Sequence, residues 1–284
     1  MCIFIFLCGR TAAELSMANC HCRHKPCNMN QPESISDEAL RAGIINFLET
    51  APAAYMPGAT VDTVIFGFHK GKLKVLLLRF GNSSYFVLPG GYIGKEESLD
   101  QAAMRLLQER TRLENIYLEQ FYTSGSADRS KDSPAKAILQ EMIGPIPNNS
   151  WFDQRFISVC YYALVDDTKV NPVTEAFFTE VKWFDINKLP KLLYDHQPII
   201  QKALKRLQAD LDEKLVGFNL MSETFTMNEL QKLYEAVYQK ELVRTNFQRK
   251  MLGLGVLERL EKQYNGKSHK APYLYRFTQA DDAV

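Results

Sequence analysis

Apolar residues in the first two thirds of the chain follow two spacings, one typical of strands and one typical of helices. Short apolar runs predict strands at 61–68, 73–78, 85–88, 115–122, 156–165 and 177–184. Apolar residues at helical spacing predict helices over 34–49, 98–111 and 195–211. A polar stretch rich in Pro and Asn, residues 130–154, interrupts this pattern. We expect it to be an insertion that carries a short helix at 135–142.

In the last quarter of the chain the spacing becomes that of two short helices. Thr226 and Glu229 form one predicted capping box, and Thr245 and Gln248 a second, since Thr can bind the backbone of a residue three positions later. Only a few residues around 239–242 separate the two helices, so the pattern predicts a helix-turn-helix. Two alternating strands follow at 256–261 and 273–277, around a hairpin at 265–267 that would serve as a wing.

The net charge of +1 hides a local excess of positive charge. Residues 240–276 contain nine Lys or Arg and three Glu, and such a basic surface is what DNA phosphates require. On the second helix we expect Phe247, Met251 and Leu254 to face the core, which leaves polar residues outward for base contacts. The candidate DNA contacts are Arg244, Thr245, Asn246, Gln248, Arg249, Lys250, Lys267, Lys270 and Arg276. A solvated face of an accessory domain is the alternative interpretation.

Residues 91–113 contain a spaced motif: Gly91, then Glu97 after five residues, and, after seven more, Arg105, Leu107, Glu109 and Leu113. With its flanks this segment resembles the Nudix box, whose pattern ends as Arg-Glu-apolar-x-Glu-Glu-x-Gly-apolar. Three positions depart from that pattern. Leu106 and Arg110 stand where the box has Glu, and Arg112 stands where it has Gly.

These departures change the chemistry of one helix face. Positions 106, 109 and 110 are three and four residues apart, so they lie side by side on a helix. The resemblance implies that active members present carboxylates there, because Mg²⁺ prefers anionic oxygen ligands. Here one Glu and one Arg cancel, and a guanidinium cannot bind a cation. The sequence therefore predicts a Nudix fold with no catalytic residues, no metal and no cofactor, in which Glu97, Arg105 and Glu109 are remnants. A chance match on an amphipathic helix is the alternative.

A Nudix-like domain followed by a winged helix is similar to the Nudix-related transcriptional regulators. Further segments that carry the likeness are 128–129, 155–164 and 194–200 in the first part, and 225–236, 246–251 and 273–277 in the second. The resemblance implies an α+β protein, in which a Nudix-type α/β/α sandwich with a mixed sheet precedes a C-terminal winged helix-turn-helix domain. It also implies a bacterial repressor or activator that senses NAD-derived metabolites or a sugar such as arabinose.

The same resemblance implies a mechanism. A small-molecule effector would bind the former substrate pocket and shift a homodimer that reads a pseudo-palindromic operator in double-stranded DNA. The candidate effector residues are Arg79, Glu97, Asp128, Arg129 and Arg155, because charged groups beside strand ends suit a polar ligand. Each of these residues singly is as well explained by a surface ion pair. Two other functions remain open: an active hydrolase that cleaves ADP-ribose or another nucleoside diphosphate derivative, and an inactive scaffold that binds protein.

The length of 284 residues suits about two domains. We expect a disordered or spurious extension over 1–33, a helix and linker over 34–55, the Nudix-like domain over 56–212 and the winged helix over 213–284. Five of the six cysteines lie in the first 27 residues, at a spacing that fits no usual zinc pattern. Cys160 is predicted to be a reduced core thiol, which indicates a cytoplasmic protein. No apolar run approaches the ~20 residues of a membrane span.

Overall fold

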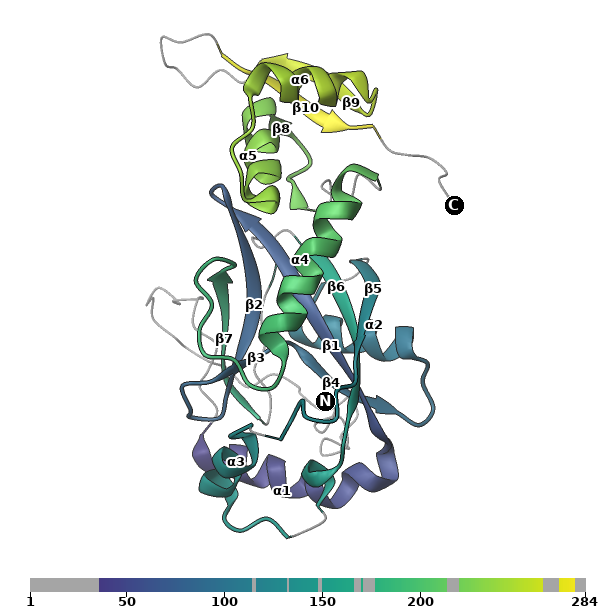
Figure 1. Ribbon diagram of the computed structural model, residues 1–284, viewed down its shortest axis with the longest axis vertical. Helices are drawn as coiled ribbons and strands as arrows, with labels where there is room; N and C mark the ends of the chain where they lie inside the picture. The colour runs from purple at the N-terminus through teal and green to yellow at the C-terminus, as the bar shows by residue number, and fades with distance from the viewer. Residues whose placement is uncertain are drawn as a thin grey trace, which may run out of the picture.

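The computed structural model describes residues 36–113, 116–131, 133–147, 150–165, 170, 177–213, 220–262 and 271–278. The predicted extension over 1–33, with its cysteines, and the predicted hairpin at 265–267 lie outside these residues. The described chain forms a large sheet domain followed by a smaller helical domain at one end of it (Figure 1). None of its helices is long and apolar enough to cross a membrane.

The first domain consists of α1 (Asp37–Ala54), β1 (Tyr55–His69), β2 (Lys72–Phe80), β3 (Phe86–Val87), β4 (Gly90–Gly94), α2 (Leu99–Thr111), β5 (Tyr117–Ser124), α3 (Ala135–Ile143), a short 3₁₀ turn η1 (Trp151–Asp153), β6 (Ile157–Val165), β7 (Phe178–Asp185) and α4 (His196–Glu213). Its seven strands form one sheet with the order β3-β2-β1-β6-β5, to which β4 is added on β1 and β7 on β2. Strands β1 and β6 run parallel and the other pairs run antiparallel, so the sheet is mixed, as expected.

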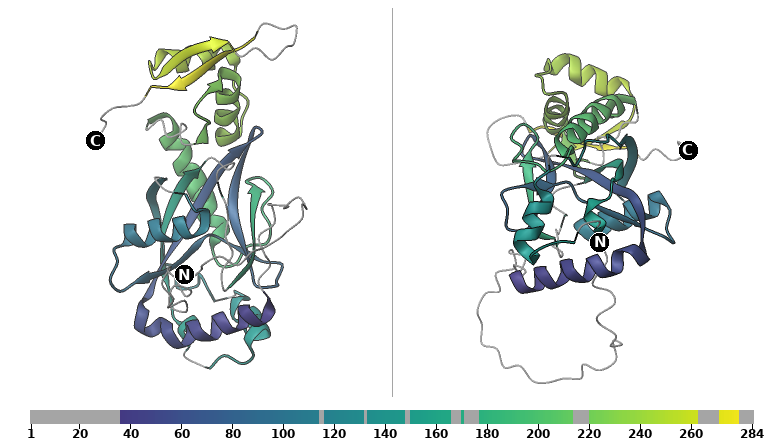
Figure 2. Two further views of the ribbon diagram at one scale, coloured as in Figure 1. Left: turned by 180° about the vertical axis from the view of Figure 1, so that it is seen from behind. Right: turned by 60° about the horizontal axis from the view of Figure 1, so that its bottom comes forward.

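Two helices cover opposite faces of this sheet, α4 in front and α2 behind in the view of Figure 1 (Figures 1 and 2). Side chains of β1 alternate between the two faces. Val61 and Ile65 pack on the side of α2, and Val64 and Phe66 pack on the side of α4. A strand buried on both faces needs apolar residues at consecutive positions, which explains its continuous apolar run. Cys160 is buried in this core, and burial raises the pKa of its thiol to about 12.

Helix α1, helix α3 and the turn η1 form a cap below the end of the sheet that is far from the second domain (Figure 1). Leu40, Ile44 and Phe47 of α1 pack with Ile138 and Leu139 of α3 in one apolar cluster. The sequence predicted both helices, although α1 begins and ends later than 34–49. Its first turn starts after Ser36, whose side chain accepts the N–H of Ala39. The predicted insertion 130–154 therefore supplies two of the three elements of the cap, α3 and η1.

The second domain consists of β8 (Phe225–Thr226), α5 (Met227–Tyr238), α6 (Arg244–Gly253), β9 (Leu257–Lys262) and β10 (Tyr273–Phe277), with the strands ordered β8-β10-β9. The first predicted capping box is confirmed, because Thr226 accepts the N–H of Glu229. The second is wrong. Helix α6 already begins at Arg244, after Val243, which has no side-chain acceptor, so Thr245 lies within the helix. Phe247 and Met251 are buried as expected, whereas Leu254 follows the helix and is 42% exposed.

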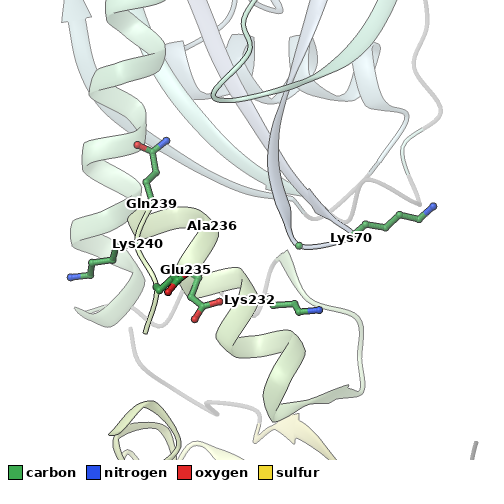
Figure 3. Close-up of a pocket in the computed structure, with 8 residues that line it drawn as sticks. Lys70, Lys232, Glu235, Ala236, Gln239 and Lys240 are labelled. Atoms are coloured by element: carbon green, nitrogen blue, oxygen red, sulfur yellow. The ribbon is translucent and has the colours of Figure 1, made fainter. Parts of the chain in front are cut away.

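Helix α4 joins the two domains, because its C-terminal half packs against α5. Leu207 and Leu211 are fully buried in the same cluster as Leu233 and Val237 of α5. The Gln208 amide donates to the Val237 carbonyl at 2.8 Å. A second contact lies at the β1–β2 turn, where an open cleft beside α5 is lined by Lys70, Gly71, Lys232, Glu235, Ala236, Gln239, Lys240 and Glu241. The labelled polar side chains of this cleft point in different directions, so they do not converge on a ligand position (Figure 3).

Candidate effector cavity and DNA-binding surface

A cavity of about 530 Å³ lies between the sheet and the cap. This volume is within the range of small-molecule sites. Much of its wall is aromatic, from Tyr92, Phe152, Phe156, Phe177 and Phe178. The rings also contact one another. Those of Tyr92 and Phe156, for example, have centroids 5.4 Å apart in an edge-to-face arrangement. Such a wall suits a ligand that contains a flat ring or the apolar face of a sugar.

The floor of the cavity is polar and centres on Asp62, which is only 8% exposed. Its carboxylate accepts the Ser158 hydroxyl at 2.5 Å and lies 3.2 Å from Nη2 of Arg129. Arg129 is held on its other side by Asp195, at 2.9 Å. Burial opposes ionisation of Asp195, but Ser124 and Arg129 outweigh it and lower the pKa of that carboxyl. The guanidinium is therefore fixed between two carboxylates before any ligand enters.

His196 lies beside Asp62 in the same floor. Nε2 of its ring is 3.7 Å from an oxygen of Asp62, and Nδ1 accepts the backbone N–H of Leu88 at 3.0 Å. The ring is almost fully buried, and this burial lowers the pKa of His196 below its usual value. The floor thus offers a neutral imidazole N–H, a carboxylate and a guanidinium within one small area.

The cap contributes a second charged pair to the cavity lining. Lys136 of α3 contacts Asp153 of η1, and Asp153 also accepts the N–H of Ser150. The Lys136 contact holds the pKa of Asp153 below its ordinary value. Both side chains are partly exposed, so this pair is weak and can exchange for ligand groups at little cost. The part of the chain predicted as an insertion therefore carries a candidate ligand-binding cation.

The charged side chains of the Nudix-like motif lie outside the cavity lining, although Gly91, its first position, borders the cavity. Arg105 pairs with Glu97 at 2.5 Å and with Glu109 at 3.3 Å, and its hydrogen bond holds the pKa of Glu97 below the ordinary value. Leu106 is buried against Gly91, where an added Cβ would approach it to 2.6 Å. Arg110 is fully buried, with its guanidinium 5.4 Å from the centroid of the Phe178 ring. Among the residues that the structure describes, no group of three His, Cys, Asp or Glu is close enough to hold a metal ion.

Of the five predicted effector residues, the structure brings only Arg129 to the cavity. Arg79 pairs with Glu180 at 2.5 Å, Asp128 pairs at the surface with Lys131, and Arg155 donates to the Gly125 carbonyl. Glu97 is held in the motif by Arg105. The expectation that these five converge is thus not met by their positions. Asp62, His196 and the aromatic wall were missed, although a single Asp inside an apolar strand is a detectable signal.

The predicted DNA contacts gather on α6. Arg244, Thr245, Asn246, Arg249 and Lys250 are exposed there, and Gln248 is partly exposed. Arg249 donates to the Asn246 side chain at 3.2 Å, so the two polar groups point the same way. Arg276 on β10 is instead paired with Glu258 at 2.6 Å. Lys267 and Lys270 lie outside the described residues. The structure thus presents a basic polar helix, supported from behind by Phe247 and Met251.

The fold and this pair of sites define a class of protein in which a Nudix domain carries a winged helix domain. The model of the NUDIX domain family matches residues 56–207, and the chain belongs to that family. The model of the NrtR DNA-binding winged helix domain matches residues 217–277. With both matches, the chain is homologous to the NrtR regulators, a Nudix-related transcriptional regulator family.

Two relatives match most of the chain, and a third matches about half of it. The chain is 29% identical over 232 residues to a protein of Acinetobacter baylyi described as an ADPR responsive transcriptional repressor, covering 79% of this chain and 84% of the relative. It is similar to the crystal structure of Shewanella oneidensis NrtR complexed with a 27mer DNA, with a TM-score of 0.58 and 28% identity, over 78% of this chain and 93% of the other. An ADP-ribose pyrophosphatase of Methanocaldococcus jannaschii is 26% identical, over 52% of this chain and 74% of that protein.

Proposed function

We propose that this protein is a DNA-binding transcriptional regulator whose Nudix domain senses a small metabolite and thereby controls operator binding. One observation carries the proposal. A ligand-sized cavity, whose lining includes Gly91 but none of the charged side chains of the altered motif, is joined through α4 to a domain that exposes a basic helix. An enzyme needs its metal ligands at the cavity, whereas a sensor needs only a cavity and a mechanical connection.

The first turn of α6 supports the DNA-binding half of the proposal. Helices are stabilised by acidic residues in their first turn, because the backbone N–H groups there carry partial positive charge. The first turn of α6 contains no acid and begins with Arg244. This arrangement costs helix stability but adds to the attraction for a phosphate. A winged helix of this kind places such a helix in the major groove.

For the effector we propose an ADP-ribose-type metabolite. The A. baylyi relative supports this choice, since that protein is described as ADPR responsive. The cavity supports it through the aromatic wall, which can stack on a base or a ribose, and through Lys136, which can exchange Asp153 for a phosphate. A free sugar, the other class that the sequence left open, would use the wall but has no charge to pair with Lys136.

The test is a binding titration with the full-length protein. A fluorescent duplex taken from DNA upstream of its gene is titrated by anisotropy, with and without ADP-ribose. We expect specific binding at moderate salt and a change in affinity of at least fivefold on adding ADP-ribose. Folded protein that binds neither this duplex nor ADP-ribose at low salt would refute the proposal. Light scattering of the protein–DNA complex tests the accompanying expectation that a homodimer occupies two half-sites.

An active hydrolase is the second candidate, because Glu97 and Glu109 are retained and the M. jannaschii relative is called a pyrophosphatase. This candidate predicts release of AMP from ADP-ribose in the presence of Mg²⁺, and loss of that release in Glu109→Gln. If turnover is found and DNA binding is not, the hydrolase is the better description.

A further inference from the structure

The floor of the cavity is connected to the beginning of α4 by a charged contact. Arg129 lines the cavity, and its guanidinium binds the Asp195 carboxylate through two nitrogen atoms, at 2.9 and 3.1 Å. Asp195 is the residue immediately before α4, and its carbonyl accepts the N–H of Ile199, which closes the first turn of the helix. Asp195 itself does not line the cavity. It therefore links a cavity residue to the helix without contacting the cavity space.

The carboxylate of Asp195 binds residues outside α4 and does not cap the helix. An Asp at the start of a helix commonly accepts N–H groups of the first turn. Here the carboxylate accepts the Ser124 hydroxyl at the end of β5 and the Arg129 guanidinium. The first turn of α4 is thus tied to Arg129 through Asp195, beside His196, the first residue of the helix, which also lines the cavity.

Helix α4 is long enough to carry a displacement to the second domain. Its 18 residues span about 27 Å at 1.5 Å per residue. At the far end, the Tyr234 hydroxyl of α5 donates to the Leu211 carbonyl at 3.4 Å, and Gln208 donates to Val237. Figure 1 shows α4 running from the lower part of the sheet to the base of the second domain.

A second charged cluster holds α4 on the sheet near that far end. Arg206 pairs with Glu119 of β5 and with Asp210, each at 2.7 Å, and the Tyr162 hydroxyl of β6 donates to Asp210 at 2.6 Å. These contacts hold the C-terminal half of α4 against β5 and β6. With this part of the helix restrained, a displacement of the first turn would change the angle at which Leu207 and Leu211 pack against α5.

We propose that Asp195 is a positioning residue that couples the cavity to the winged helix. A ligand that draws the Arg129 guanidinium into the cavity weakens the Arg129–Asp195 pair, the first turn of α4 is released, and the tilt of α4 repositions α5 and α6. The biological role of this coupling rests on the proposed function. The mechanical connection between the cavity and the winged helix does not depend on it. The same contact in the absence of ligand holds the winged helix in one orientation.

The test uses full-length Asp195→Asn with Asp128→Asn as matched control, since Asp128 is an exposed carboxylate that pairs with Lys131 at the surface and lies outside the cavity lining. ADP-ribose affinity is measured by calorimetry, and operator affinity by anisotropy with and without ADP-ribose. For Asp195→Asn we expect ADP-ribose affinity within about threefold of wild type, and an effect of ADP-ribose on operator affinity reduced to less than a third of that in wild type. Equal effects in wild type and Asp195→Asn would overturn the inference.

Hydrogen–deuterium exchange separates this inference from the proposed function. Without any ligand or DNA, Asp195→Asn is expected to speed exchange in the first turn of α4 and in α5, and Asp128→Asn is not. If ADP-ribose neither binds the wild-type protein nor changes its operator affinity, the proposed function is refuted. The exchange experiment still tests whether Asp195 couples the cavity to α5. Unchanged exchange in α5 refutes the coupling. Should Asp195→Asn fold poorly, Asp195→Glu keeps a carboxylate but displaces it by one methylene from the position that pairs with Arg129, and the same outcomes apply.

Discussion

The backbone N–H of Leu88 donates to Nδ1 of His196 at 3.0 Å. Because a backbone N–H can only donate, Nδ1 must be an acceptor, and the ring is therefore neutral with its proton on Nε2. That proton faces Asp62, whose oxygen is 3.7 Å away. The neutral form is the one that burial favours, in line with the lowered pKa of His196.

Stability is consequently expected to fall as the pH is lowered from about 6.5, the ordinary pKa of His. Below that pH the unfolded chain takes up a proton on this residue, whereas the native state does not until its own lower pKa is reached. The free energy of unfolding is measured by urea titration from pH 7.5 to 5.5 for wild type and His196→Gln. The variant should show a shallower slope over this window. Identical slopes would mean that His196 takes up its proton equally in the native and unfolded states, and would contradict the lowered pKa.

The strands and helices of this chain were predictable because their signal is local. Val61 to Phe68 and the stripe of α4 show their periodicity in the sequence alone. The two-residue strand β8 and the glycine-rich β4 were not foreseen, because so few apolar positions give no period. Helix α6 begins two residues before the start that the predicted capping box at Thr245 would give, because Val243 precedes it without a side-chain cap and the buried Phe247 and Met251 hold it in place.

The candidate site was less predictable, because its contacts join residues far apart in the sequence. Asp62 forms hydrogen bonds with Ser158, 96 residues away in the sequence, and with Arg129, 67 residues away. Arg79 forms a hydrogen bond with Glu180, 101 residues away, and this pairing holds it away from the cavity. A charged residue beside a strand end has no local feature that tells a cavity contact from an ion pair. The alternation of β1 places Asp62 and Val64 on one face of the sheet. The aromatic wall of the cavity is formed by tertiary packing, which the sequence of β1 does not show.

Loss of the Arg249 side chain is expected to weaken operator binding by about 1–3 kcal/mol, the value of one good contact to a base. The exposed Arg249 and Asn246 are held together at 3.2 Å and can act as a unit in the groove. Arg249→Ala is compared with Lys205→Ala, which removes one positive charge from the exposed surface of α4. Anisotropy titrations with the specific duplex and with a scrambled one separate base contacts from phosphate contacts. Equal losses on both duplexes would show that Arg249 binds only the backbone.

Lys136→Met is expected to weaken ADP-ribose binding by about 1.5–3 kcal/mol if Lys136 forms a charge-assisted hydrogen bond to a phosphate. The matched control is Lys182→Met on β7, a lysine paired with Glu180 outside the cavity. Calorimetry on the full-length protein measures both affinities. The affinity of the ligand for a second variant, Asp153→Asn, shows whether the ligand is anionic or neutral. An anionic ligand should bind more tightly once this carboxylate is neutralised, and a neutral ligand that bonds both members of the pair should bind more weakly in both variants.

Mg²⁺ is expected to bind weakly and to be unnecessary for effector binding. A divalent ion needs several carboxylate oxygens free to face it, and here Arg105 occupies both Glu97 and Glu109 while Leu106 and Arg110 are buried. Recruiting the two Glu side chains would require breaking their pairs with a guanidinium that then remains beside the ion, which adds like-charge repulsion. Isothermal titration of the protein with MgCl₂ should give no saturable heat below about 1 mM, because few carboxylates remain to bind the ion. EDTA should leave the affinity for ADP-ribose unchanged. Tight, stoichiometric uptake that is lost in Glu109→Gln would show that the motif opens to receive an ion, and would favour the hydrolase over the sensor.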